Sequence, residues 1–278
     1  MCRLYGFHSN EATKVECTLI YAQNALMIQS RADLRGVSHA DGWGIGFYVD
    51  SRPFIERRDK AAYQDLHFGS TAERVHSKTV VAHVRKATVG GLSTVNTHPF
   101  GYGSWIFAHN GTITAYNQIR ERLERQTTPE FLAARKGSTD SELAFLWLLS
   151  RMRGGGVDPD DVCTDLGRLV HIFGQSIRTL AEWCREQQAP QDARLNFLLT
   201  DGRIVLASRW NNSLYWVSRQ GVHDCEVCGI PHIQHQPEVN YQSVVLASEP
   251  ISDESWLAIP ERHLIAVDQA IHCRIMPV

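Results

Sequence analysis

The residue with the most distinctive chemical potential is the cysteine at position 2. Once Met1 is removed, the chain begins with Cys2, and a single residue then carries both a thiol and a free α-amine. An α-amine has a reference pKa of about 7.7–8.0, so it can accept a proton near neutral pH. A thiol needs such a base, or a positive field, to become a good nucleophile. Taken alone, Cys2 is better explained as an ordinary cysteine that happens to be second, so the rest of the chain must decide.

Two polar motifs placed after predicted strands would complement a nucleophile. Arg85 follows the β-branched run 79–84 and precedes a glycine-bearing loop, where its guanidinium could hold a carboxylate through two hydrogen bonds. The alternative for a lone arginine is an exposed ion pair of little energetic value. Further along, the Asn110 amide and the Gly111 N–H would make a workable oxyanion hole for acyl transfer. Asn-Gly is also a common hairpin turn, and that alternative stays open.

Two further side chains have both a functional and a plain interpretation. Asp140 lies at the predicted start of a helix, where it could bind an ammonium group or simply interact favourably with the helix dipole. His98 precedes Pro99, and a lone His-Pro more often marks a turn than a catalytic group.

The elements that must position these residues follow from apolar periodicity. Leu143, Phe145 and Leu149 recur at helical spacing in a stretch that ends at three glycines, and Asp201-Gly202 between two apolar runs predicts a hairpin. Strands, then helices, then strands indicate an α+β layered fold with mainly antiparallel sheets. The expected strands are 42–49, 79–84, 104–108, 196–200, 204–207, 214–217, 243–247 and 264–267, and the expected helices are 139–152 and 161–187.

Composition and charge narrow the classes of protein. The chain has 278 residues, a net charge of -2, and 43% hydrophobic and 21% charged residues, which are globular values, and no linker-like tract divides it. The near-neutral charge favours neither nucleic acid nor a membrane surface as a partner, and no apolar stretch is long enough to span a bilayer. The N-terminus lacks signal-peptide features. Seven scattered cysteines do not suggest a disulfide framework, so we expect a cytoplasmic protein.

Read together in chain order, these segments resemble the class II glutamine amidotransferases, which are N-terminal nucleophile hydrolases. The resemblance implies a four-layer αββα sandwich of two antiparallel sheets, formed by residues 1–278 as one domain with its catalytic motifs within 2–142. The matching motifs are Met1-Cys2, Asp41-Gly42-Trp43-Gly44, Arg85-x-Ala87-Thr88, Asn96-x-His98-Pro99, His109-Asn110-Gly111 and Thr139-Asp140-x-Glu142, and a looser match continues through 196–207 and 246–250.

The resemblance also implies a catalytic role for three residues. Cys2 would attack the γ-carboxamide carbon of glutamine and form a thioester, with its own α-amine moving the proton. Asn110 and the Gly111 N–H would stabilise the oxyanion. No cofactor is implied by this chemistry.

The remaining family positions would bind the substrate. Arg85, with Thr88 nearby, would hold the α-carboxylate, and Asp140 would pair with the α-ammonium group. The loop 86–94 could close over the substrate as a lid. We assign His98 a structural role, although it matches a motif position near the site.

The chain is similar to the small stand-alone members of the family rather than the large synthases. It is too short to hold a synthase domain that would receive ammonia. We therefore expect either hydrolysis of glutamine or a γ-glutamyl compound, or transfer of ammonia with a synthase or amidase partner protein. The alternative is a non-catalytic glutamine-binding regulatory subunit of a larger complex.

A second cluster of possible ligands lies at 223–235. Cys225 and Cys228 form a Cys-x-x-Cys pair, and His232 and His235 follow, so the donors for zinc are present. The spacing is not that of a zinc finger, and the resemblance requires no metal here. A loop with a polar insertion is the slightly favoured interpretation, and a zinc-dependent module is the least favoured of the functional hypotheses.

Overall fold

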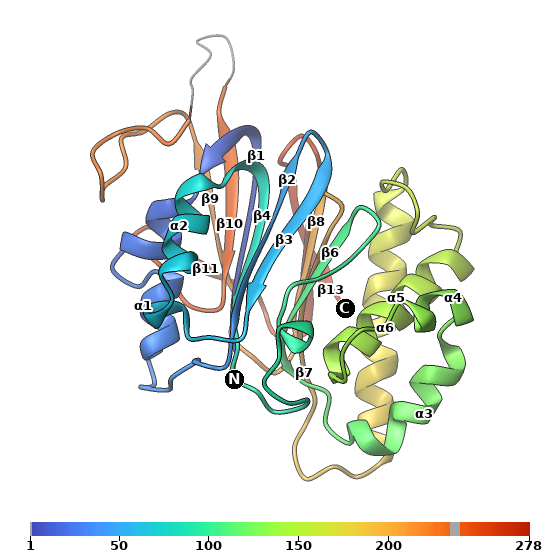
Figure 1. Cartoon of the computed structure of the whole chain (residues 1–278). Helices are drawn as coiled ribbons and strands as arrows, with labels where there is room; N and C mark the ends of the chain where they lie inside the picture. Colours follow the sequence, from blue (N-terminus) through green and yellow to red (C-terminus); the bar gives the residue numbers. More distant parts are fainter. Residues whose placement is uncertain (1, 234–239) are drawn as a thin grey trace.

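The computed structural model describes residues 2–233 and 240–278 and consists of two antiparallel β-sheets packed face to face, with helices on both outer faces (Figure 1). Every strand pair in both sheets is antiparallel. The expected four-layer αββα architecture is thus confirmed.

The seven-stranded sheet has the order β11-β9-β10-β1-β4-β2-β3, and the six-stranded sheet has the order β13-β12-β8-β7-β6-β5. The strands of the first sheet are β1 (Arg3–Lys14), β2 (Trp43–Val49), β3 (Arg52–Arg58), β4 (His76–Val84), β9 (Tyr215–Gln220), β10 (Gln242–Ala247) and β11 (Leu257–Ala258). Those of the second are β5 (Phe100–Tyr102), β6 (Trp105–Thr112), β7 (Arg194–Thr200), β8 (Val205–Arg209), β12 (His263–Val267) and β13 (Cys273–Pro277).

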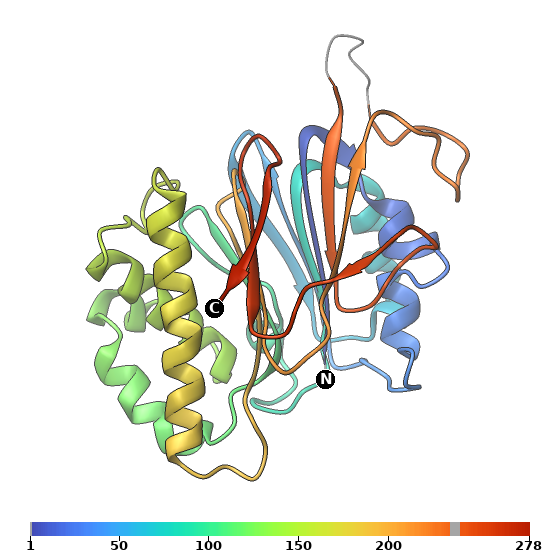
Figure 2. The same cartoon turned by 180° about the vertical axis from the view of Figure 1, so that it is seen from behind.

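The helices divide between the two outer faces. The seven-stranded sheet is covered by α1 and α2, and the six-stranded sheet by α3–α6, of which the long α6 crosses the outer face in the view from behind (Figure 2). Their bounds are η1 (π-helix, Cys17–Tyr21), α1 (Leu26–Arg31), η2 (Ala62–Gln64), α2 (Leu66–Arg74), η3 (Thr94–Asn96), α3 (Tyr116–Gln126), α4 (Pro129–Ala133), α5 (Asp140–Gly154) and α6 (Leu166–Glu186).

Alternation along the strands separates three apolar layers. In β6, Trp105 and Phe107 pack against the helices, whereas Ile106 and Ala108 pack between the sheets. The sheets approach closely at Gly6 of β1, where a Cβ atom would lie 2.4 Å from a methyl carbon of a leucine in β7. A side chain at this position would force that leucine side chain to move, so glycine allows the two sheets to approach closely here.

The pairing of β1 brings distant parts of the sequence to its first residue. β1 is antiparallel to both β4 and β10, with Arg3 opposite Val84 and Tyr5 opposite Ala247. The start of β1 therefore lies beside the ends of both neighbours. Cys2 precedes β1 directly, so the segments following β4 and β10 are placed next to it.

The predicted elements agree with the structure in most places and differ at some ends. The 201–204 turn joins β7 to β8 as expected, and α5 occupies the predicted helix. The second predicted helix begins at Leu166 rather than at residue 161, because the Asp165 side chain accepts a hydrogen bond from the Arg168 N–H and caps it there. The strand expected at 104–108 continues to Thr112, so Asn110 pairs with β7 and is not part of a hairpin turn.

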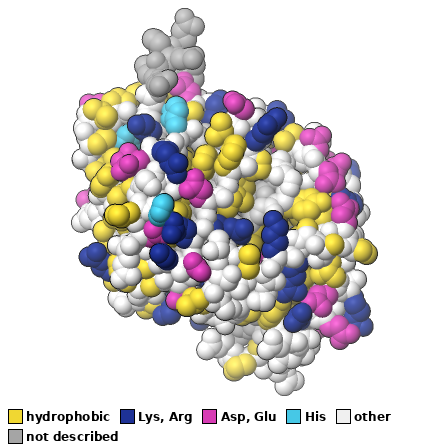
Figure 3. Space-filling view, in the orientation of Figure 1, with side chains coloured by type: hydrophobic (Ala, Val, Ile, Leu, Met, Phe, Trp, Pro, Cys, Tyr) yellow, Lys and Arg dark blue, Asp and Glu magenta, His cyan; other side chains and the backbone are white. Residues whose placement is uncertain are grey.

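The distribution of surface charge and the apolar character of the helices are relevant to the partners that the chain could bind. On the face seen in Figure 3, basic and acidic side chains are interspersed. Among the residues that the structure describes, no helix combines the length and apolar character needed to cross a membrane.

Candidate active site

Cys2 is buried at the start of β1, with 6% of its surface exposed. Its Sγ accepts a hydrogen bond from the Lys86 backbone N–H at 3.3 Å. Burial raises the pKa of the Cys2 thiol, and this outweighs the opposing effects of the Lys86 N–H and the nearby Arg85 charge. A thiol of raised pKa needs a base to become a thiolate, so the environment does not activate Cys2 by itself.

A buried ion network fixes the backbone of Cys2. Arg3 donates from Nη1 to the Cys2 carbonyl oxygen at 2.9 Å, and its Nη2 forms ion pairs with Asp33 and with Glu249, the latter at 2.8 Å. Burial would raise the pKa of Asp33, but hydrogen bonds from the Val37 N–H and His39, together with the Arg3 charge, lower it to about 2. The backbone of Cys2 is therefore anchored by charged partners that the sequence analysis did not identify.

Asn110 is held by a serine at the end of β10. Its Nδ2 donates to Ser248 Oγ at 2.7 Å, and Ser248 Oγ also accepts the Leu4 N–H at 2.9 Å. The Leu4 carbonyl in turn accepts the Ser248 N–H at 3.0 Å. Since Leu4 is two residues from Cys2, Ser248 links the Asn110 amide to the strand that follows Cys2. One N–H of the Asn110 amide remains available for an oxyanion.

Gly111 is required by close packing rather than by an unusual backbone angle. A Cβ atom at this position would lie 1.9 Å from the Arg194 carbonyl oxygen of β7. Any side chain would push β6 away from β7 and displace the neighbouring Asn110. The glycine of the His-Asn-Gly motif therefore keeps the end of β6 in register.

Arg85 is buried at the end of β4, and its guanidinium is directed into the following loop. It donates to the carbonyl oxygens of Val89 at 3.0 Å and of Gly90 and Gly91 at 3.2 Å each. Burial lowers its pKa, with opposing contributions from Cys2 and nearby carboxylates. Carbonyl oxygens thus engage this guanidinium, and a carboxylate would make stronger, charge-assisted bonds at the same donors.

The loop 86–94 is tied to the site at several points. The Ala87 N–H donates to the Asp41 carboxylate at 2.8 Å, and Thr88 Oγ1 lies 3.3 Å from Thr112 Oγ1 at the end of β6. Asn96 joins the loop to the segment before α5, because its Nδ2 donates to the Gly91 carbonyl and its Oδ1 accepts the Ser138 N–H. The loop that holds Thr88 is therefore folded over the end of β6.

Asp140 is the first residue of α5 and is 4% exposed. Its Oδ2 accepts the Ile113 N–H at 2.9 Å, and its Oδ1 accepts the Ser141 N–H at 2.8 Å. The Thr139 hydroxyl caps the helix by accepting the Glu142 N–H. These bonds hold the Asp140 carboxylate at the end of β6, and its charge acts on both Cys2 and Arg85.

His98 lies in a buried aromatic stack. Its ring centroid is 4.3 Å from that of His83 and 4.6 Å from that of Phe100. Burial lowers the pKa of His98 well below its usual value, with the charges of neighbouring histidines adding to the effect. A neutral ring packed in this way supports the structural role that we expect for His98.

The charges of Arg85 and Asp140 therefore both act on the Cys2 thiol. Asn110 is connected to the start of β1 through hydrogen bonds to Ser248. The sequence analysis missed the supporting residues Ser248 and Glu249. Both lie in the 246–250 segment, whose similarity to the family was the available signal.

Two antiparallel sheets packed between two helical layers form the fold of the N-terminal nucleophile hydrolases. Within that class, the chain belongs to the class II glutamine amidotransferases, since the family model described as "Glutamine amidotransferases class-II" matches residues 1–275. It is an enzyme family, and the match covers every motif discussed above.

Known relatives extend over most of the chain. A gamma-glutamyl-hercynylcysteine sulfoxide hydrolase of Mycolicibacterium smegmatis is 30% identical, over 91% of this chain and 89% of the relative. The probable glutamine amidotransferase DUG3 of Saccharomyces cerevisiae is 28% identical, over 96% of this chain and 82% of the relative. Among solved structures, the glutamine phosphoribosylpyrophosphate amidotransferase of B. subtilis has the same fold, with a TM-score of 0.62 and 15% identity over 99% of this chain and 49% of that one.

Proposed function

We propose that this enzyme cleaves the γ-amide of glutamine or of a γ-glutamyl compound through a thioester on Cys2, after removal of Met1. The observation that carries the proposal is the surroundings of the thiol. Arg85 and Asp140 provide one cation and one anion near Cys2, and the anchored Asn110 amide lies on β6 of the facing sheet. A glutamyl group has a carboxylate, an ammonium group and a neutral amide, which need these three kinds of partner beside a nucleophile.

In the first half of the reaction, the Cys2 α-amine takes the thiol proton and the sulfur attacks the amide carbon. The C–N bond then breaks, and the nitrogen leaves with a proton from the α-ammonium group of Cys2. An amine as the base fits the raised pKa of the buried thiol. The Asn110 amide and the Gly111 N–H stabilise the negative oxygen of the tetrahedral intermediate.

In the second half, the α-amine takes a proton from water, and the resulting hydroxide attacks the thioester carbon. The C–S bond breaks, the thiol regains its proton, and glutamate leaves. Water is the acceptor in this scheme, so the chain needs no partner for turnover. A partner synthase or amidase would change only the fate of the released ammonia or amine.

Substrate binding requires the guanidinium of Arg85 to exchange partners. The substrate α-carboxylate would displace the loop carbonyls that now accept its bonds, and Thr88 would assist from the loop. Asp140, already oriented by two backbone N–H groups, would accept the α-ammonium group. Binding would therefore rearrange the loop 86–94, in keeping with a lid.

The test is glutamate release from a panel of γ-glutamyl amides, including glutamine and glutathione, by protein whose N-terminus is verified by mass spectrometry to be Cys2. Cys2→Ala should abolish release, while Cys163→Ala, which alters a thiol beside Asp201 at the far end of β7 from Asn110, should not. A glutamine-like electrophile should label Cys2 alone. Labelling of another residue, or unchanged turnover in Cys2→Ala, would refute the proposal, and substrate binding without turnover would indicate the regulatory subunit instead.

A further inference from the structure

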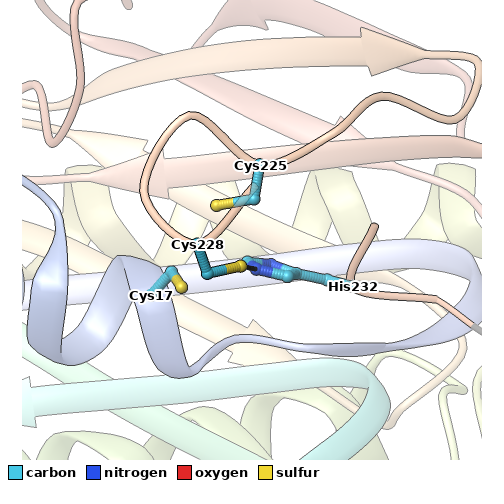
Figure 4. Close-up of side chains that lie close together, drawn as sticks. All are labelled: Cys17, Cys225, Cys228 and His232. Atoms are coloured by element: carbon cyan, nitrogen blue, oxygen red, sulfur yellow. Dashed lines mark hydrogen bonds between the residues drawn. The ribbon is translucent and has the colours of Figure 1, made fainter. Parts of the chain in front are cut away.

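Four metal-binding side chains meet at a place that the proposed reaction does not use. The ligand atoms of Cys17, Cys225, Cys228 and His232 all lie within 4.8 Å of one another (Figure 4). Cys228 Sγ and His232 Nε2 lie 3.2 Å apart. Around a tetrahedral zinc ion, with Zn–S near 2.3 Å and Zn–N near 2.0–2.1 Å, ligand atoms are separated by roughly 3.5–3.8 Å. Small movements would thus bring all four into coordination.

We propose that Cys17, Cys225, Cys228 and His232 bind one zinc ion, which fastens the connection between β9 and β10 to the first turn of η1. Three thiolates and one imidazole form a complete tetrahedral set with no position left for water, as in structural zinc sites. Sulfur-rich donors also select zinc against magnesium and calcium, which prefer oxygen. His235, the fourth candidate from the sequence, lies outside the described residues, and Cys17 takes its place.

The Cys-x-x-Cys segment is already shaped as a turn around the sulfur atoms. The Gly229 N–H donates to the Cys225 carbonyl at 2.8 Å, and Gly229 has a φ of +73°, a conformation that favours glycine. The Val227 N–H is directed at Cys225 Sγ at 3.4 Å. The backbone of the 225–229 turn is therefore already arranged around the Cys225 sulfur.

The other two ligands are held by the body of the fold. Cys17 is buried at the start of η1, with 5% exposure. The His232 carbonyl accepts the Lys14 N–H at 2.9 Å, which joins the segment to the end of β1. Figure 4 shows Cys225, Cys228 and His232 from one segment grouped beside Cys17, which comes from another part of the chain. Such convergence of separate segments is what distinguishes a metal site from a chance pair of cysteines.

The loop that carries these ligands has little else to stabilise it. Residues 221–231 form no helix or strand, and two apolar side chains are well exposed, Val227 at 46% and Ile230 at 61%. A segment that buries so little apolar surface gains little free energy from packing. A zinc ion would supply the missing cross-link, because metal binding by a segment that is disordered without it stabilises the folded form.

The site is remote from the nucleophile. Cys2 precedes β1 and Cys17 follows it, and a strand of 12 residues extends roughly 35–40 Å. Figure 1 likewise shows the chain start and the β9–β10 connection at opposite ends of the sheet. We therefore expect zinc to act on the stability of the loop and not on amide cleavage, so this proposal and the proposed reaction can fail independently.

The test is the zinc content of the purified full chain, measured by plasma mass spectrometry after dialysis against metal-free buffer. Wild type should hold about one equivalent of zinc per chain. The double variant Cys225→Ser/Cys228→Ser should hold at least about tenfold less, and Cys17→Ser should show the same loss. The matched controls are Cys163→Ser and Cys273→Ser, which remove thiols outside the cluster and should keep the zinc of wild type.

Limited proteolysis reports on the loop independently of the metal assay. Chelation should speed cleavage within 221–231 in wild type and leave the rate unchanged in the double variant, while glutamate release persists in both. Since Cys228 is exposed, Cys228→Ser checks the result in a variant whose folding is not at risk. Zinc below about a tenth of an equivalent in wild type supplied with zinc during expression would overturn the proposal. So would a disulfide within the cluster, or controls that lose zinc equally.

Discussion

Ser248 offers the sharpest test of how the proposed site is held together, because its hydroxyl oxygen accepts hydrogen bonds from both the Asn110 amide and the Leu4 N–H. Ser248→Ala removes the 2.7 Å bond to Asn110 Nδ2 and the 2.9 Å bond to the Leu4 N–H. It leaves the substrate-binding residues untouched. We therefore expect kcat to fall while KM for glutamine changes little, since the lost orientation matters most when the oxyanion forms.

The size of the effect follows from the bonds that are lost. A neutral hydrogen bond contributes about 0.5–1.5 kcal/mol, so the loss of amide orientation should lower kcat by roughly 2- to 13-fold. Asn110→Ala removes the donor itself and should cost about 10²–10³ in kcat. Leaving the buried Leu4 N–H without an acceptor should also cost about 1–3 kcal/mol of unfolding free energy.

The assay is a double-mutant cycle on glutamate release, combined with urea unfolding. If Ser248 acts through Asn110, Ser248→Ala should have no further effect on kcat in the Asn110→Ala background. The matched control is Ser243→Ala in β10, the strand that Ser248 follows, because Ser243 is also fully buried but its hydroxyl has no partner in the described structure. Additive effects in the cycle, or an equal fall in kcat for Ser243→Ala, would refute the positioning role.

Three other changes test separate parts of the proposal. Protein that retains Met1, verified by mass spectrometry, should release glutamate at least about 100-fold more slowly than processed protein, because the base at Cys2 becomes a peptide nitrogen. Asp140→Asn removes the negative charge proposed to bind the substrate ammonium group. The loss of about 1.5–3 kcal/mol of binding free energy should raise KM for glutamine roughly 10- to 150-fold. A KM equal to that of wild type would count against this role of Asp140. His98 has a lowered pKa in the folded state, so its contribution to stability is complete above its unfolded pKa of about 6.5 and falls by about 1.4 kcal/mol per pH unit below it. His98→Phe should therefore unfold in urea with a weaker dependence on pH between 6.5 and 5, and an unchanged dependence would show that the histidine is not held neutral.

The sequence was informative wherever the structure depends on local patterns. The α5 helix was predictable because its apolar residues repeat at helical spacing after a capping Thr139, and the β7–β8 hairpin because Asp201-Gly202 suits a tight turn. Cys2, Arg85 and Asp140 were recognisable because their motifs match the family in order. Each of these signals lies within a few residues of chain.

Features that depend on pairing between distant segments could not be predicted in the same way. Strand β1 was missed because the run of three polar residues from Ser9 to Glu11 breaks the expected alternation. Cys17 was not considered as a ligand because only the pairing of β10 with β1 carries the β9–β10 connection to the end of β1. Ser248 looked like an ordinary residue after a strand, and its role appears only when its partners Leu4 and Asn110 are known.

The antiparallel arrangement explains why residues so far apart in sequence can share one site. A strand flanked by two antiparallel neighbours has its first residue next to the last residue of each, and β1 has β4 on one side and β10 on the other. Cys2, the proposed nucleophile before β1, is thus surrounded by segments that leave the sheet, where Arg85 and Ser248 lie. Because these segments are not confined to strand pairing, they can carry side chains that bond to the loop 86–94 and to Asn110. The opposite end of β1 has the same geometry, which is why the Cys17 cluster can form there without contacting Cys2.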